Sequence, residues 1–270
     1  MLPRVDLIRT QESDWALLAT NDVISNHLKR FGQWGQNELT LARMALAEQE
    51  SFVVLDIGAN LGGFTVPIAK FVDSRKGKVF AFEPQRLVFQ QLCANVFINR
   101  LDNVYAFQEA LGDQDCLIEL PEVDLEHTNN VGGLSADPAI RKKLLQDQAT
   151  GKDYKIRFNE VTHKTRQIRL DSFEIDAQVS FIKLDVEGCE LAFFRGAAKT
   201  LEQNGFPPIF FEQWLEKPWF ADRAKETNDF LLNLGYEIQF LAANDEAYAQ
   251  HPKNISCPAL QIEEGKVFVR

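Results

Sequence analysis

The chain has 270 residues, with 39 acidic and 29 basic side chains and a formal net charge of −10. Hydrophobic residues make up 45% and charged residues 25%, a composition typical of a globular protein and not of a disordered chain. The acidic balance argues against a nucleic-acid partner, although it leaves a local basic patch open. We predict no membrane association, because Asp56, Asn60 and Lys70 interrupt the most apolar stretch, Phe52–Val72.

The opening segment and the cysteines both favour a cytoplasmic protein. The first residues, MLPRVDLIRTQESDW, lack the apolar core of an export signal. The four cysteines are far apart and form no Cys-x-x-Cys pair, so the sequence supports neither a zinc motif nor a redox motif.

The predicted elements begin with a helical leader over residues 1–50, which includes an amphipathic segment around Leu39, Arg43 and Leu46. Short apolar runs predict strands at 52–57, 78–83, 103–108, 180–186, 208–212, 236–241 and 266–269. Helical patterns alternate with these runs at 63–72, 84–99, 188–204 and 221–234. This alternation predicts one domain over 51–270, a mainly parallel sheet with helices on both faces.

A stretch from about 121 to 165 interrupts the alternation. It has few large apolar residues and contains the turn-like NNVGG (Asn129–Gly133) and a charged helical pattern around Ile140–Gln148. We interpret it as an insertion or lid over one edge of the domain, flanked by short strands at 117–120 and 166–170.

A glycine-containing turn follows the first strand of the sheet, in the segment Asp56-Ile-Gly-Ala-Asn-Leu-Gly-Gly63. Ligands of such sheets bind at the carboxyl ends of the strands, where Gly58 permits a tight turn. Gly62 and Gly63 let a ligand approach backbone N–H groups at a helix start. Asn60 stands where a dinucleotide fingerprint has glycine, which favours a cofactor without a pyrophosphate.

Glu83 ends the second strand, at a distance from the glycine turn that suits an acceptor of hydrogen bonds from both ribose hydroxyls of an adenosine. A solvated loop residue or a helix cap is the alternative for a lone glutamate before proline. Because it follows the glycine turn, we favour the ribose role.

Four motifs carry a family resemblance. They are VLDIGANLGGFT (54–65), FAFEPQRLVFQQLCAN (80–95), EALGD (109–113) and IKLDVEGCEL (182–191), and GQWGQNEL (32–39) precedes them. In this order they resemble the FkbM family of S-adenosylmethionine-dependent methyltransferases. The resemblance implies a Rossmann-like class I methyltransferase fold, a seven-stranded, mostly parallel α/β sheet with helices on both faces and an antiparallel last strand. After Trp214 the resemblance becomes hard to follow, and 242–270 matches little.

The resemblance also implies a binding site for S-adenosylmethionine. From the methionine end of the cofactor to its adenine, the residues at matching positions are Asp56, Gly58, Asn60, Gly62, Phe64, Thr65, Glu83, Glu109 and Ala110, with Asp185 close to the sulfonium and the acceptor. The NNVGG segment resembles a turn near the acceptor pocket, against the alternative of an ordinary surface turn.

Acidic residues at the ends of the later strands are the catalytic candidates. A hydroxyl acceptor needs a base to remove its proton, and we name Asp185, Glu187 and Glu212 for this site. Glu187 and Glu190 have an alternative role in complementing a helix dipole. Lys183 either pairs structurally or lies in a charged cleft. The same carboxylates suit Mg²⁺, but no dense Asp-x-Asp pattern supports it, and we predict no metal.

These observations favour O-methylation of a hydroxyl on a small-molecule or glycan acceptor. The alternatives are a nucleotide-cofactor oxidoreductase on a Rossmann-like fold and a nucleic-acid or protein methyltransferase. Asn60 argues against the oxidoreductase, and the acidic balance argues against nucleic acid. A non-catalytic relative of the fold is a further alternative, which the intact turn and Glu83 disfavour.

Overall fold

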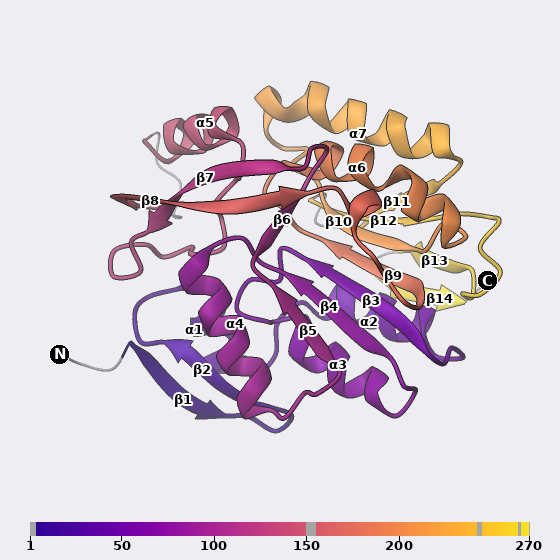
Figure 1. Ribbon diagram of the computed structural model, residues 1–270, viewed down its shortest axis with the longest axis horizontal. Helices are drawn as coiled ribbons and strands as arrows, with labels where there is room; N and C mark the ends of the chain where they lie inside the picture. Colours follow the sequence, from indigo (N-terminus) through magenta and orange to yellow (C-terminus); the bar gives the residue numbers. More distant parts are fainter. Residues whose placement is uncertain (1–3, 150–154, 242–244, 264–265, 270) are drawn as a thin grey trace.

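The computed structural model describes residues 4–149, 155–241, 245–263 and 266–269. Its centre is a seven-stranded sheet (Figure 1), whose strands in spatial order are β11 (Glu237–Phe240), β12 (Glu246–Gln250), β10 (Ile209–Glu212), β9 (Gln178–Leu184), β3 (Phe52–Ile57), β4 (Lys78–Phe82) and β5 (Val104–Phe107). Strand β12 runs antiparallel to both of its neighbours, and the other six strands all run in one direction. The predicted sheet is therefore present, with its antiparallel strand.

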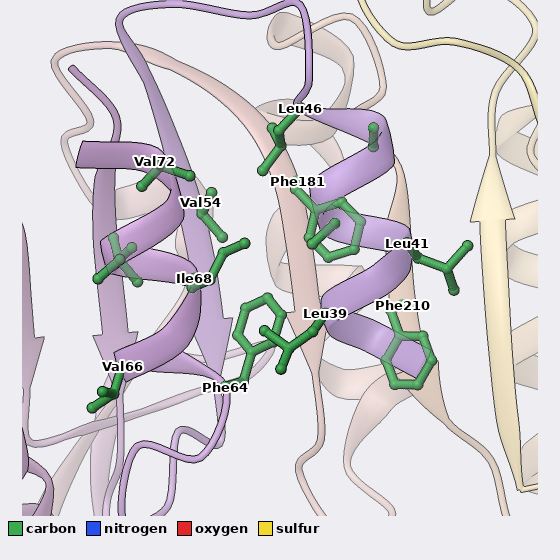
Figure 2. Packing of buried hydrophobic residues seen from close by; sticks show 14 of the residues in the cluster. Leu39, Leu41, Leu46, Val54, Phe64, Val66, Ile68, Val72, Phe181 and Phe210 are labelled. Carbon is green, nitrogen blue, oxygen red and sulfur yellow. The ribbon is translucent and has the colours of Figure 1, made fainter. Parts of the chain in front are cut away.

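Helices cover both faces of the sheet because its strands alternate buried residues between two hydrophobic clusters. The helices are α1 (Val23–Phe31), α2 (Gln36–Ala45), α3 (Thr65–Asp73), α4 (Arg86–Ile98), α5 (Pro138–Ala149), α6 (Glu190–Gln203) and α7 (Ala221–Leu234), with short 3-10 turns η1 (Leu170–Ser172) and η2 (Pro218–Phe220). Along β3, Val54 packs with α2 and α3, whereas Val53 and Leu55 pack with α6. Figure 2 shows Leu39 of α2 and Phe64 beside α3 meeting on the first of these faces.

The start of the chain differs from the predicted helical leader. Residues 4–18 form a hairpin of β1 (Val5–Arg9) and β2 (Asp14–Leu18), and only then do α1 and α2 follow. Trp15 and Leu17 of β2 are buried, and the side chain of Asn95 in α4 accepts a hydrogen bond from Ala16 N–H at 2.7 Å. The helical prediction was wrong here because β2 is stabilised by a helix distant in sequence, which local periodicity does not reveal.

The segment between β5 and β9 forms a second, smaller sheet. Its strands are β6 (Glu109–Leu111), β7 (Cys116–Val123) and β8 (Phe158–Ile168), in the order β6-β8-β7. Figure 1 shows β7 and β8 side by side, with α5 beyond them. Strand β8 begins inside the region predicted as an insertion, so this region is partly a long hairpin.

The last strand of the central sheet is also not the predicted one. Lys266–Val269 forms β14, which pairs with β13 (Leu260–Glu263) in a separate two-stranded sheet. The seventh strand is instead β12, which inserts between β10 and β11. Three of its residues, Ala247, Tyr248 and Ala249, are fully buried. Their alternation was not read as a strand because two small alanines give a weak apolar signal.

Candidate functional site

A cavity of about 820 Å³ opens at the carboxyl ends of β3, β4, β9 and β10. This is the position at which ligands bind open α/β sheets, and the volume falls in the range of small-molecule and cofactor sites. We call the lining residues at these strand ends the floor: Ile57, Gly58, Asn60, Phe82, Glu83, Asp185, Val186, Glu187 and Glu212.

The glycine turn predicted from the sequence is locked against the end of β9. Gly58 has φ +76°, and a Cβ on it would lie 1.7 Å from the carbonyl oxygen of Asp185. The backbone N–H of Asp185 in turn donates to the carbonyl of Ile57 at 2.9 Å. Only glycine fits here, because both the backbone conformation and the close approach exclude a side chain.

Four residues predicted for the cofactor support the floor from below and do not line the cavity. Asp56 is fully buried, and Thr65 Oγ1 donates to its Oδ2 at 2.5 Å. Phe64 lies in the hydrophobic core, and a Cβ on Gly62 would meet Leu92. The side chains of Asp56, Phe64 and Thr65 thus lie in the core and not in the cavity, which differs from the direct contact expected of them, while Gly62 allows the close packing of Leu92.

Lys183 neutralises the buried Asp56, and its ammonium also lies 3.4 Å from a carboxylate oxygen of Asp185. Burial raises the pKa of Asp56, and the Lys183 charge opposes that rise. Of the two alternatives raised for Lys183, the structure thus shows the structural pairing; Lys183 does not line the cavity itself, but its ammonium contacts Asp185, which does.

Glu83 lines the cavity although its side chain is almost wholly buried. Its two carboxylate oxygens accept hydrogen bonds from the backbone N–H groups of Asn60, at 3.0 Å, and Gln85, at 2.9 Å. Burial raises the pKa of Glu83 to about 7, and these two hydrogen bonds only partly oppose the rise. Glu83 therefore holds the turn at Asn60. Its carboxylate oxygens have further lone pairs that can accept hydrogen bonds from a ligand.

The two residues predicted near the adenine both line the cavity, at the start of β6. Ala110 is buried, and Glu109 lies 3.3 Å from the guanidinium of Arg166 on the neighbouring strand β8.

The three predicted catalytic carboxylates come together. Asp185, Glu187 and Glu212 all line the cavity, and each offers a carboxylate oxygen within 4.8 Å of the others. Burial raises the pKa values of Glu187 and Glu212 well above the usual range, and the negative charge of nearby carboxylates, Asp185 among them, raises both further. Glu190 instead accepts the N–H of Gly188 at 3.1 Å, which fits its alternative role at a helix start.

These three carboxylates are also the one group in the described part of the chain with the spacing of metal ligands. Hard cations such as Mg²⁺ take oxygen ligands of this kind. The expectation that no metal takes part stays a prediction.

Residues from the N-terminal segment and the insertion cover the cavity, and we call them the roof. They are Val23, Ile24, Trp34, Asn130, Gly132, Gly133, Leu134, Ala136, Asp137, Pro138, Leu144, Asp147, Gln148 and Ile156. The buried carboxylate of Asp22 joins the two segments, accepting from Ser25 N–H at 2.9 Å and from Val131 N–H at 3.2 Å. The sequence predicted an insertion or lid over 121–165, which contains the roof residues of the second segment, and it singled out the NNVGG turn among them. The roof residues before position 50 were not predicted, although GQWGQNEL was the signal for Trp34.

The cavity is strongly acidic. Among its described lining residues ten are acidic (Glu83, Glu109, Asp113, Asp137, Asp147, Asp185, Glu187, Glu212, Glu226 and Asp245) and three are basic (Arg195, Lys217 and Arg223). Arg223 pairs with Asp137 at 3.1 Å, and Arg195 lies 3.7 Å from Glu226. Lys217 Nζ lies over the ring of Trp214.

A family model described as the methyltransferase FkbM domain matches residues 56–238. The chain belongs to this family. The domain over these residues is therefore an S-adenosylmethionine-dependent methyltransferase domain, which confirms the predicted family, cofactor and fold class and removes support from an oxidoreductase. In the part of the FkbM chain that the structure describes, no helix is long and apolar enough to cross a membrane.

A 72-residue stretch is 38% identical to the tRNA(Phe) (4-demethylwyosine(37)-C(7)) aminocarboxypropyltransferase of Methanocaldococcus jannaschii. The match spans 26% of this chain and 28% of the relative. Among solved structures, the FkbM methyltransferase of Methylobacillus flagellatus is 17% identical with a TM-score of 0.45, over 74% of this chain and 44% of that one. An S-adenosylmethionine-dependent O-methyltransferase of Thermotoga maritima is 15% identical with a TM-score of 0.45, over 92% and 78%.

Proposed function

We propose that this chain transfers the methyl group of S-adenosylmethionine to a hydroxyl group of a small-molecule or glycan acceptor. The observation that carries the proposal is the group of three cavity-lining carboxylates, Asp185, Glu187 and Glu212, within 4.8 Å of one another. A hydroxyl loses its proton on methylation, and a positioned carboxylate is a suitable acceptor for it.

The residues of the cavity fit the cofactor. Glu83 is a buried carboxylate that lines the cavity and suits the ribose hydroxyls, while Gly58 and Asn60 suit the methionine end. Glu109 and Ala110 line the same cavity, which supports the role expected of them beside the adenine. When bound, the cofactor supplies an electrophilic methyl group on a cationic sulfur, which negative charge nearby favours. Asp56 and Thr65 contribute indirectly, by holding the turn from below.

The environment of Glu187 and Glu212 suits a general base. A carboxylate with a raised pKa takes a proton more readily than an ordinary one, and burial followed by neighbouring negative charge raises the pKa values of both groups. Asp185 faces the same space and suits the orientation of the acceptor. Holding acceptor and methyl group in line supplies a large part of the rate acceleration of such a transfer.

A nucleic-acid acceptor is the competing function, because the Methanocaldococcus relative is named as a tRNA enzyme. The match covers only 26% of this chain. The described cavity lining, with ten acidic and three basic residues, repels a phosphate backbone. We therefore favour an uncharged or positively charged acceptor.

Calorimetric titration with S-adenosylhomocysteine and with NAD tests the cofactor. We expect binding of the former and none of the latter. Release of S-adenosylhomocysteine is then followed with alcohols, sugars, amines and transfer RNA as acceptors, with and without EDTA. Turnover with a hydroxyl acceptor, lost in Glu187→Gln and kept in the exposed control Glu216→Gln, supports the proposal. Turnover with amines or RNA alone contradicts it.

The product of the cofactor separates methyl transfer from the chemistry named for the relative. Methyl transfer leaves S-adenosylhomocysteine, whereas transfer of the aminocarboxypropyl group leaves methylthioadenosine. Chromatography of the reaction mixture distinguishes the two. Methylthioadenosine as the main product would contradict the proposed reaction.

A further inference from the structure

The ammonium group of Lys183 contacts Asp56, Gly58 and Asp185. Lys183 lies on β9 beside Asp56 of β3, and the two are register partners in the parallel sheet. Its side chain is 8% exposed, and its ammonium donates to the carbonyl oxygen of Gly58 at 2.7 Å. The same ammonium lies 3.4 Å from Oδ1 of Asp56 and 3.4 Å from Oδ2 of Asp185.

A buried ammonium is costly, so a lysine in a central strand needs compensating partners. Asp56 on the neighbouring strand supplies a buried counter-charge, and the partly exposed carboxylate of Asp185 supplies a second one. Burial by itself lowers the pKa of Lys183, but the carboxylates of Asp185, Asp56 and Glu38 outweigh it and hold the pKa above its usual value. The ammonium therefore stays charged and remains a donor to its other two partners.

Those two partners follow neighbouring strands of the central sheet. Gly58 belongs to the turn after β3, and Asp185 follows β9; both line the cavity. The contact with Lys183 engages one oxygen of the Asp185 carboxylate, whose side chain is 42% exposed. A single buried cation thus joins the cofactor turn to the carboxylate on the acceptor side.

We propose that Lys183 is a positioning residue, whose ammonium holds the Gly58 carbonyl and the Asp185 carboxylate in the arrangement that binds the cofactor and orients the acceptor. This role rests on the proposed placement of the cofactor and of Asp185. It acts through the two partners and requires no contact between Lys183 and a ligand.

Removing Lys183 alone would leave Asp56 as a buried carboxylate without its cation, which destabilises proteins strongly. The test therefore compares Asp56→Asn with the double variant Asp56→Asn/Lys183→Met, in which the buried pair is neutral. The readout is the affinity for S-adenosylhomocysteine, whose sulfur is uncharged, so the change reports position and not sulfonium electrostatics. We expect about tenfold weaker binding in the double variant, from loss of the charged hydrogen bond to Gly58.

Turnover gives the second readout, through a cycle with Asp185→Asn in the Asp56→Asn background. If Lys183 acts through Asp185, the combined loss falls short of the product of the two separate losses by about threefold or more. Lys78→Met is the matched control, because Lys78 pairs with Asp176 at 2.9 Å at the far end of the sheet. Lys78→Met should leave the affinity for S-adenosylhomocysteine unchanged. Any effect of Lys78→Met on turnover should simply multiply with the effect of Asp185→Asn.

Urea unfolding separates these readouts from simple loss of stability. S-adenosylhomocysteine affinity within twofold of that of Asp56→Asn, in a folded double variant, overturns the role of Lys183 and leaves the proposed function standing. If Asp56→Asn does not fold, the double variant, in which the buried pair is neutral, is compared with the wild-type chain. A wild-type chain that binds neither S-adenosylmethionine nor its product overturns both proposals.

Discussion

The floor and the roof of the cavity are built in different ways. Floor residues follow parallel strands that are neighbours in the sheet, so short motifs place them together. Roof residues come from segments about a hundred positions apart, joined by contacts such as that of Asp22 with Val131. The floor rests on buried ionic and backbone contacts inside the core, whereas the roof is held by hydrogen bonds between loops and helix ends and by a small hydrophobic cluster that includes Leu18, Val131 and Leu134.

This difference predicts separable effects of substitution. Floor residues share contacts with the core, so changing them should alter stability together with chemistry or cofactor affinity. Changes in the roof should alter ligand affinity at a small cost in stability.

The largest expected effect is on turnover, in Asp185→Asn. The variant keeps the shape of the side chain and loses the charge that suits it to orient the acceptor, so we expect turnover to fall by about 100-fold or more. Affinity for S-adenosylhomocysteine should stay within about threefold. Steady-state kinetics and calorimetry measure both, with Glu216→Gln as the exposed control, and wild-type turnover would remove Asp185 from the reaction.

Gly58→Ala tests how tightly the floor is joined to the core. The added Cβ would lie 1.7 Å from the Asp185 carbonyl oxygen, so backbone must move and the free energy of unfolding should drop by about 3 kcal/mol or more. Gly205 is the control, because its φ is also positive, at +67°, and a Cβ there meets nothing within 4 Å. Gly205→Ala should cost only about 1 kcal/mol. Equal urea midpoints for the two variants would contradict the close approach.

Glu83→Ala removes the proposed acceptor for the ribose hydroxyls. We expect S-adenosylhomocysteine to bind more weakly by about 1–3 kcal/mol, which calorimetry measures directly. Glu119→Ala, an exposed change on β7, is the control. Unchanged affinity in a folded Glu83→Ala variant would place the ribose elsewhere.

The raised pKa of Glu83, about 7 in the folded chain, predicts a pH dependence of stability. The usual value for a glutamate is 4.5, so between these two pH values the folded state keeps a proton that the unfolded state has lost. Stability is therefore full below about pH 4.5 and declines as the pH rises to 7, by about 1.4 kcal/mol per pH unit for each such group. Glu83→Gln removes one such group, so the free energy of unfolding, measured with urea at pH 5, 6 and 7, should decline less steeply with pH. An unchanged slope would show that Glu83 ionises normally.

The smallest effect is expected in the roof, from Asp22→Ala. It removes the acceptor for two backbone N–H groups, at Ser25 and Val131, and should lower the free energy of unfolding by about 1 kcal/mol. The affinity for S-adenosylhomocysteine should fall several-fold, because the N-terminal segment and the insertion lose the hydrogen bond between Asp22 and Val131. Asn21→Ala, a neighbouring exposed change, should affect neither. A loss of stability as large as that of Gly58→Ala would erase the distinction between floor and roof.

The sequence predicted most of the floor because its signals are local. Gly58, Asn60, Glu83 and the Asp185 cluster all line the cavity. Direct contact with the cofactor was expected of Asp56 and Thr65, but their side chains are buried and do not line the cavity. The motif contains both residues, but Asp56 pairs with the buried Lys183 on another strand, and Thr65 donates a hydrogen bond to Asp56. Local sequence does not reveal such a partner.

The N-terminal hairpin and strand β12 were missed for a similar reason. Strand β2 is buried against α4, and β12 is an antiparallel strand inserted between two others. Neither arrangement leaves a periodic pattern strong enough to read without its partner.

The sequence by itself thus determined the acidic charge, the alternation of strands and helices, the methyltransferase family and most residues at the strand ends. These follow from composition, periodicity and motifs, which act over a few neighbouring residues. Only the tertiary structure decided that Asp22 joins the two parts of the roof, that Lys183 reaches both Gly58 and Asp185, and that the described cavity lining is mostly acidic. Those features depend on contacts between distant segments, which packing creates and local sequence does not encode.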